Sequence, residues 1–78
     1  MSRRVAPILE IAEKVQARAL ELASSANDAD LHINRPGVYR YPEPTPLGVH
    51  WGLSTGSAGA IDYLRAAEAD IARDWDIQ

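Results

Sequence analysis

Residues 7–26, which read PILEIAEKVQARALELASSA, decide the fold. Apolar side chains recur there at spacings of three and four residues, the period of one face of an α-helix. They are Ile8, Ile11, Ala12, Val15, Ala19, Leu22, Ala23 and Ala26. Pro7 suits a first helical turn, where its missing N–H is not needed. We predict an amphipathic helix over about residues 5–26. Leu9 and Leu20 widen its apolar face to roughly half the circumference, more than one small sheet covers.

The middle of the chain, residues 31–54, has the pattern of short strands. Its last part reads LGVHWGLS, with an apolar residue at every second position, which is the period of a half-buried strand. Two earlier runs, 31–34 and 38–41, alternate in the same way. Pro36-Gly37 joins them and favours a type II turn. We therefore predict an antiparallel meander of two or three short strands.

A proline-rich connector, residues 42–46, separates the second predicted strand from the third. Proline cannot donate a ladder hydrogen bond, so this segment is expected to be an extended loop. A loop that is already extended loses little entropy on docking. Tyr39, Tyr41 and Pro44 are therefore candidate contact residues for another protein.

A second helix is predicted over about residues 57–76. Ser57 is a good N-cap type, and Asp62 adds favourable negative charge near the first turn. The apolar stripe also contains Glu68, and it consists of Ala60, Ile61, Leu64, Ala67, Ile71 and Trp75. The sequence thus predicts one α+β domain spanning residues 1–78, in which two amphipathic helices flank a short antiparallel β-meander.

The length of 78 residues and the absence of cysteine predict a thin core without disulfides. Small chains of this kind gain stability from association, so we expect protein partners and a homo-oligomer. The wide face of the first helix is the main candidate interface, together with two aromatic anchors. Its candidate residues are Ile8, Leu9, Val15 and Leu20, and the anchors are Trp51 and Trp75.

The charge balance and hydropathy exclude several other functions. The net charge of −3 argues against nucleic-acid binding, which needs a basic surface. Arg35 and Arg40 are expected to pair with acidic side chains rather than with phosphate. The chain contains no run of 18 apolar residues and has no secretory leader pattern, so neither export nor membrane insertion is predicted.

Residues 52–56, Gly-Leu-Ser-Thr-Gly, match the G-x-S-x-G motif of serine hydrolases. That chemistry needs a large α/β sheet and a histidine downstream of the serine, whereas His32 and His50 both lie upstream of Ser54. We interpret the segment as a turn of small polar residues. No P-loop lysine follows the glycines, so no enzyme and no cofactor are predicted.

A metal site is the other chemical alternative, because imidazole and carboxylate groups suit zinc. His32 and His50 are the two histidines, and no short pair of ligands is present. Both alternate with apolar residues, so we interpret them as members of a polar strand face and predict no metal site.

The N-terminal stretch VAPILEIAEKVQARA, residues 5–19, resembles the opening helix of phage head-to-tail joining proteins, the tail-completion or neck family. Residues 50–56, HWGLSTG, and residues 63–69, YLRAAEA, are similar to that family's ending. The chain is shorter than is usual for the family, and Asn27–Asp30 replaces a common Thr-Gly segment. The resemblance implies a non-enzymatic virion component that forms a ring between portal and tail. With the Arg- and Ala-rich composition, it points to an actinobacterial phage.

Two functions are therefore open at this stage. The first is a structural interaction protein, a phage head-tail connector, located in the virion or the host cytoplasm and contacting copies of itself or other virion proteins. The second is a small regulatory protein that binds and modulates one host protein through the same surfaces.

Overall fold

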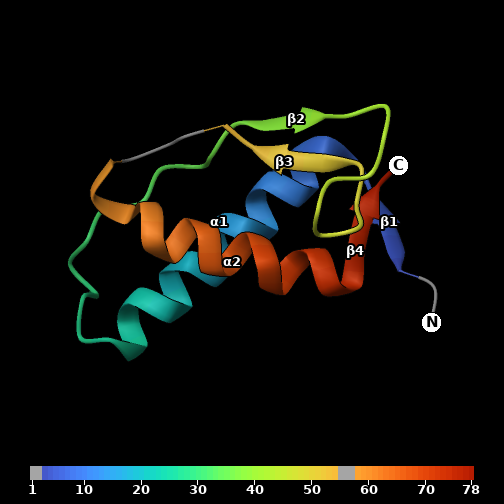
Figure 1. Ribbon diagram of the computed structural model, residues 1–78. Helices are drawn as coiled ribbons and strands as arrows, with labels where there is room; N and C mark the ends of the chain where they lie inside the picture. The colour runs from blue at the N-terminus through green and yellow to red at the C-terminus, as the bar shows by residue number, and fades with distance from the viewer. Residues whose placement is uncertain (1–2, 55–57) are drawn as a thin grey trace.

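We describe the protein from a computed structural model, in which residues 3–54 and 58–78 are described. In chain order the elements are β1 (Arg4–Ala6), α1 (Ile8–Ser25), β2 (Val38–Arg40), β3 (Trp51–Leu53), the single-turn 3₁₀ helix η1 (Ala58–Ala60), α2 (Ile61–Asp74) and β4 (Trp75–Ile77). The two long helices pack against each other, and the short strands form two separate two-stranded sheets (Figure 1). The protein is therefore a small α+β fold.

The first helix is the element that the sequence predicted best, although it begins at Ile8 and not at residue 5. The Pro7 carbonyl accepts the Ile11 N–H at 3.1 Å and so starts the helical ladder. At the other end Asn27 adopts a left-handed conformation with a φ of 63°. The Asp28 N–H then bonds to the Ala23 carbonyl at 2.8 Å, as in a Schellman cap. Local chemistry therefore defines both ends of α1.

The two ends of the chain form a parallel sheet that the sequence pattern did not predict. β1 pairs with β4 in a register that sets Val5 opposite Asp76 and Ala6 opposite Ile77. The predicted second helix, about 57–76, is wrong at its end, because α2 stops at Asp74 and the chain becomes extended. Burial of Ala6 and Ile77 in the core favours this pairing. Strands of three residues are too short to reveal a two-residue period.

The antiparallel part of the predicted meander consists of β2 and β3, which pair with Tyr39 opposite Gly52. The predicted strand at residues 31–34 is wrong, because this segment forms no ladder with β2 or β3. Ile33 is instead buried in the core, and its carbonyl accepts the Gln16 Nε2–H at 2.9 Å. A side chain of α1 therefore replaces a strand as hydrogen-bond partner of the segment.

The segments that lead into β2 and into β3 also differ from the prediction. Gly37 does not have the positive φ that a type II turn requires, because it is extended and its carbonyl accepts the Ser54 N–H at 2.9 Å. The alternating pattern of residues 47–54 becomes a strand only at Trp51. Before it, Gly48 has a φ of 83° and donates its N–H to the Thr45 carbonyl, which closes a turn.

The core lies between the two helices and the β2–β3 pair. The largest fully buried side chains are those of Trp51, Ile11, Leu64, Val15 and Val49. Alanines fill many of the remaining buried positions of both helices, so the helix axes can approach closely. Across the helix contact, Arg18 Nε donates to Asp70 Oδ2 at 2.9 Å.

Glu68, the acidic residue within the apolar stripe of α2, has a structural role. Its side chain is nearly buried, and its Oε2 accepts the Leu53 N–H at 3.0 Å. Its Oε1 accepts a hydrogen bond from Arg65 at 3.2 Å. The carboxylate therefore accepts the Leu53 N–H, which points away from β2, and ties β3 to α2. A buried N–H that needs an acceptor explains an acidic residue at this buried position.

Candidate protein-interaction surface

The candidate interface residues fall into three groups in the structure. The exposed side chains include Leu9 at 59% and Tyr39 at 57%, followed by Leu20, Tyr41 and Pro44. Ile8 and Trp75 are half-buried. Val15 and Trp51 are fully buried in the protein's own core and present no surface to a partner. The wide apolar face of the first helix is therefore divided between the core and solvent.

A groove runs along α1 beside the segment that leads into β2. It consists of two hollows of about 690 Å³ and 280 Å³ that share Arg35 in their lining. Leu20 lines the larger hollow and Leu9 the smaller one. We call this feature the α1 groove; its lining residues are Ile8, Leu9, Ala12, Glu13, Gln16, Ala17, Leu20 and Arg35–Val38.

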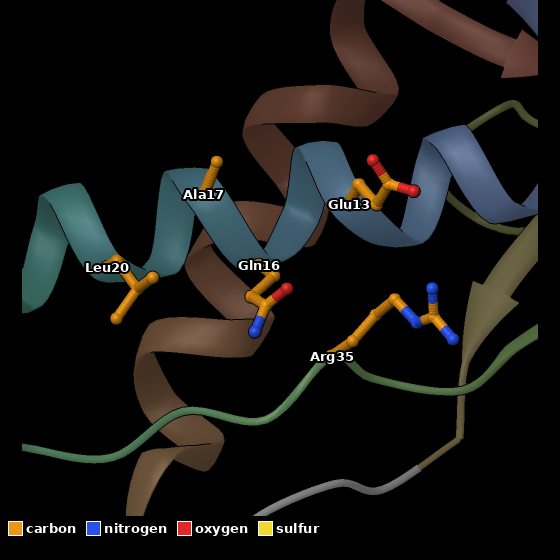
Figure 2. A pocket seen from close by; sticks show the side chains of 5 residues that line it. All are labelled: Glu13, Gln16, Ala17, Leu20 and Arg35. Atoms are coloured by element: carbon orange, nitrogen blue, oxygen red, sulfur yellow. The ribbon is translucent and has the colours of Figure 1, made fainter.

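The α1 groove has apolar ends and a charged middle, which is lined by Arg35 and by Glu13 of the helix. Figure 2 shows Gln16 and Leu20 reaching from α1 towards the chain segment that carries Arg35, whose side chain extends alongside the helix. The hydrogen bond from Gln16 to the Ile33 carbonyl ties the segment that carries Arg35 to α1. The groove is thus open to solvent and held by a contact within the chain.

Arg35 has no hydrogen bond, ion pair or aromatic contact within residues 3–54 and 58–78. Arg35 and Arg40 were both expected to pair with acidic residues, and neither does so; Arg40 donates to the Gln78 carbonyl at 2.7 Å. Every other cationic side chain has a partner in the described residues. Arg3 donates to backbone carbonyls, Arg4 and Lys14 lie on the Trp75 ring, and Arg18, Arg65 and Arg73 bind carboxylates. The guanidinium of Arg35 is therefore available to a ligand.

A second exposed apolar feature is the proline-rich loop, which we define as residues 41–47. Tyr41 and Leu47 are each 40% exposed at its two ends. The Tyr41 ring lies so close to Gly52 that a Cβ added to the glycine would be 2.8 Å from a ring carbon. Arg3 donates to the Leu47 and Gly48 carbonyls at 3.2 and 3.1 Å. The loop is therefore fixed at both ends.

Between this loop and α2 lies a further hollow of about 580 Å³, lined in part by Tyr41, Leu47 and the Arg65–Glu68 ion pair. Its charged groups already neutralise each other, and Glu68 is also held by the Leu53 N–H. The hollow thus offers apolar surface but no free charge to a ligand.

The histidines do not form the chemical sites that the sequence raised as alternatives. His50 Nδ1 lies 2.9 Å from Asp76 Oδ2, and His32 Nε2 lies 2.7 Å from Asn34 Oδ1. Neither ring forms a hydrogen bond with Ser54. Thr55 and Gly56 of the G-x-S-x-G match, like the predicted N-cap Ser57, lie outside the described residues. The described part of the chain also has no group of three or more side chains placed to hold a metal ion.

The ionisation of Asp76 makes the stability of the fold depend on pH in the acid range. Partial burial opposes the charged form, but hydrogen bonds from the His50 ring and from the His50 and Ile77 N–H groups outweigh burial and lower the pKa of Asp76. Because the pKa of Asp76 is lower in the folded chain than in the unfolded chain, its ionisation stabilises the fold at any pH above the pKa of the unfolded state. This stabilisation is lost as the pH falls through the lower pKa of the folded state.

We predict that Asp76→Asn lowers the free energy of unfolding by about 1–2 kcal/mol at neutral pH, because it removes hydrogen bonds to a charged acceptor. Its stability should also fall less steeply than that of the wild type below about pH 4. Urea titrations across this range measure both effects. Asp74→Asn, at an exposed position nearby, is the matched control and should behave as wild type.

No protein-family model matches the sequence, and comparison with curated proteins and with solved structures found no match for the chain. Within the described residues, no helix combines the length and apolar character that a membrane crossing requires.

Two features of the surface were missed from the sequence. Arg35 was named from the sequence as a residue that pairs with an acidic side chain. Whether it has a partner depends on where the fold places every acidic group. Leu47 was assigned to a half-buried strand, whereas the turn at Gly48 places it on the exposed loop. The Pro-Leu-Gly sequence after Thr45 is the signal that indicates this turn, since Pro favours its second position and Gly its fourth.

Proposed function

We propose that this protein is a non-enzymatic interaction component that associates with copies of itself as part of a larger assembly. The observation that carries the proposal is the α1 groove, in which Leu9 is 59% exposed and Arg35 lacks a partner in the described residues. Burying a leucine of this exposure in an interface contributes up to about 1.5–3 kcal/mol. A groove with apolar ends and charged side chains in the middle, Arg35 and Glu13, suits a protein segment better than a small polar substrate.

The finer proposal is a structural virion protein of the head-tail connector class. Its support is the resemblance of residues 5–19, 50–56 and 63–69 to that family. In this role the partners are further copies of the chain or other virion proteins, and the location is the virion or the host cytoplasm. The non-enzymatic part of the proposal rests on the sequence order, in which both histidines lie upstream of Ser54.

The second candidate is a regulatory protein that binds one host protein as a monomer. It would use the same α1 groove, in which Leu9 is exposed and Arg35 has no partner in the described residues. Such a groove accepts a partner segment without prior oligomerisation. The two candidates differ in whether the pure protein associates with itself.

Molar mass measured by light scattering after size exclusion, over a wide range of protein concentration, tests the proposal. We expect a discrete oligomer for the wild type. Leu9→Asp should shift it towards the monomer, because a carboxylate in an apolar contact is unfavourable. Ala66→Asp adds the same charge at an exposed position of α2 outside both surfaces and is the matched control. A wild-type monomer at every concentration would contradict self-association and favour the regulatory binder.

A further inference from the structure

We propose that the proline-rich loop of one copy docks into the α1 groove of a second copy, with Glu43 of the loop against Arg35 of the groove. This inference rests on the proposed self-association and names the surfaces that carry it. It assigns a role to two charged side chains that otherwise have no partner in the described residues.

Charge complementarity selects this occupant. Arg35 is the cationic side chain without a partner in the described part of the chain, and it lies where the two hollows of the groove meet. Glu43 is exposed at the centre of the loop and likewise makes no ion pair or hydrogen bond with any described residue. A guanidinium and a carboxylate can form two parallel hydrogen bonds, which fixes orientation as well as adding energy.

The apolar residues on the two surfaces have a similar order. In the groove, Leu9 and Leu20 lie on either side of the Arg35 guanidinium, about 16 Å apart along the helix at 1.5 Å per residue. In the loop, Tyr41 and Leu47 lie on either side of Glu43 in the sequence, and both are partly exposed. In sequence order, the loop thus has a charged residue between two apolar residues, as the groove has in space, and Tyr41 and Leu47 also line the hollow beside α2.

The loop is already ordered for docking. Three prolines restrict its backbone, the Thr45 N–H bonds to the Val49 carbonyl at 2.8 Å, and Arg3 holds its C-terminal end. A segment ordered before binding loses less conformational entropy in the complex. The same contacts keep the loop from folding back into the groove of its own chain.

The loop and the groove are two different surfaces of the chain. In Figure 1 the loop lies beside β4, whereas α1 runs from that region towards the opposite end of the molecule. If each copy gives its loop to the next copy, the contact is heterologous, and it generates a ring if the rotation closes and an open filament if it does not. If two copies exchange loops, the contact closes as a two-fold dimer, and the measured mass distinguishes these assemblies.

Charge reversal tests the contact. Arg35→Glu and Glu43→Arg, each alone, should raise the dissociation constant of the oligomer at least about tenfold, because each sets like charges against each other. The chain carrying both substitutions should recover the wild-type mass, since the pair is restored in reversed order. An equimolar mixture of the two single variants should also associate. Asp30→Arg, at an exposed position outside both surfaces, controls for net charge.

The outcomes separate this inference from the proposed function. If the wild type is an oligomer and neither single variant changes its mass, self-association stands and the loop-to-groove contact is wrong. If both single variants dissociate but the double variant does not recover, the two residues act elsewhere and the contact is also wrong. A wild-type chain that is monomeric throughout overturns both proposals. Circular dichroism of each variant checks that the exposed substitutions leave the fold intact.

Discussion

Replacement of Val15 by aspartate is expected to unfold the chain at ambient temperature. Val15 lies at the middle of α1 and is fully buried within the core cluster. A carboxylate there loses its hydration without gaining a partner, which costs about 3–5 kcal/mol, and the apolar contacts of valine are lost as well. A chain of 78 residues has about 4–12 kcal/mol of stability at the usual value per residue, so the substitution removes most of it.

Leu9→Asp is the control for Val15→Asp, because it places the same carboxylate on the same helix at a position that is mostly exposed. Its free energy of unfolding should stay within about 0.5 kcal/mol of the wild-type value, as is usual for surface substitutions. Both urea midpoints are measured by circular dichroism at low protein concentration, where any oligomer is dissociated. A cooperative transition at the wild-type midpoint for Val15→Asp would show that the core described for α1 is incorrect.

This pair of substitutions also indicates how far the sequence predicts the interface. The wide apolar face of the first helix was correctly expected to exceed what one small sheet covers. Periodicity alone cannot tell which part of a wide stripe faces the protein's own core. Val15 was therefore included among the interface candidates although it is buried, whereas Leu9 and Leu20 are exposed as an interface requires.

Elements were predicted well where one local signal extends over many residues. α1 repeats its apolar period over 18 residues, and its bounds differ from the prediction by a few residues. β1 and β4 have three residues each and are paired across the whole length of the chain, so no local pattern indicates them. The false strand at 31–34 shows the opposite error. Alternation there reflects Leu31 and Ile33, which pack on the core from a segment that forms no ladder and that α1 holds through Gln16.

The charged part of the candidate site depends on contacts that are distant in the sequence. Arg3, for instance, donates to the carbonyl of Ala72, and Arg18 pairs with Asp70. Only when all such pairs are known does Arg35 stand out as the cation without a partner in residues 3–54 and 58–78. The sequence thus provides candidates for an interaction surface, and the fold determines which of their charges are free.

Trp51→Ala is expected to be the second severe substitution, with a loss of about 3–5 kcal/mol in the free energy of unfolding. The Trp51 side chain has no exposed surface and is the largest in the core. Its Nε1–H also donates to the Trp75 carbonyl at 3.1 Å, which ties β3 to the start of β4. Alanine therefore leaves a cavity and an unsatisfied carbonyl between the antiparallel pair and the C-terminal strand.

Trp51→Phe separates these two contributions, because phenylalanine keeps most of the ring volume and removes the donor. We expect it to lose about 1–3 kcal/mol, clearly less than alanine, since a lost hydrogen bond leaves one acceptor unpaired while the cavity stays largely filled. Tyr39→Ala, on the neighbouring strand and 57% exposed, is the control and should change the free energy of unfolding by less than about 1 kcal/mol. Equal losses for Trp51→Ala and Tyr39→Ala would mean that β3 does not lie over the helices as described. A larger loss at Trp51 means that this buried tryptophan stabilises the fold, whereas the exposed Tyr39 ring contributes little to it.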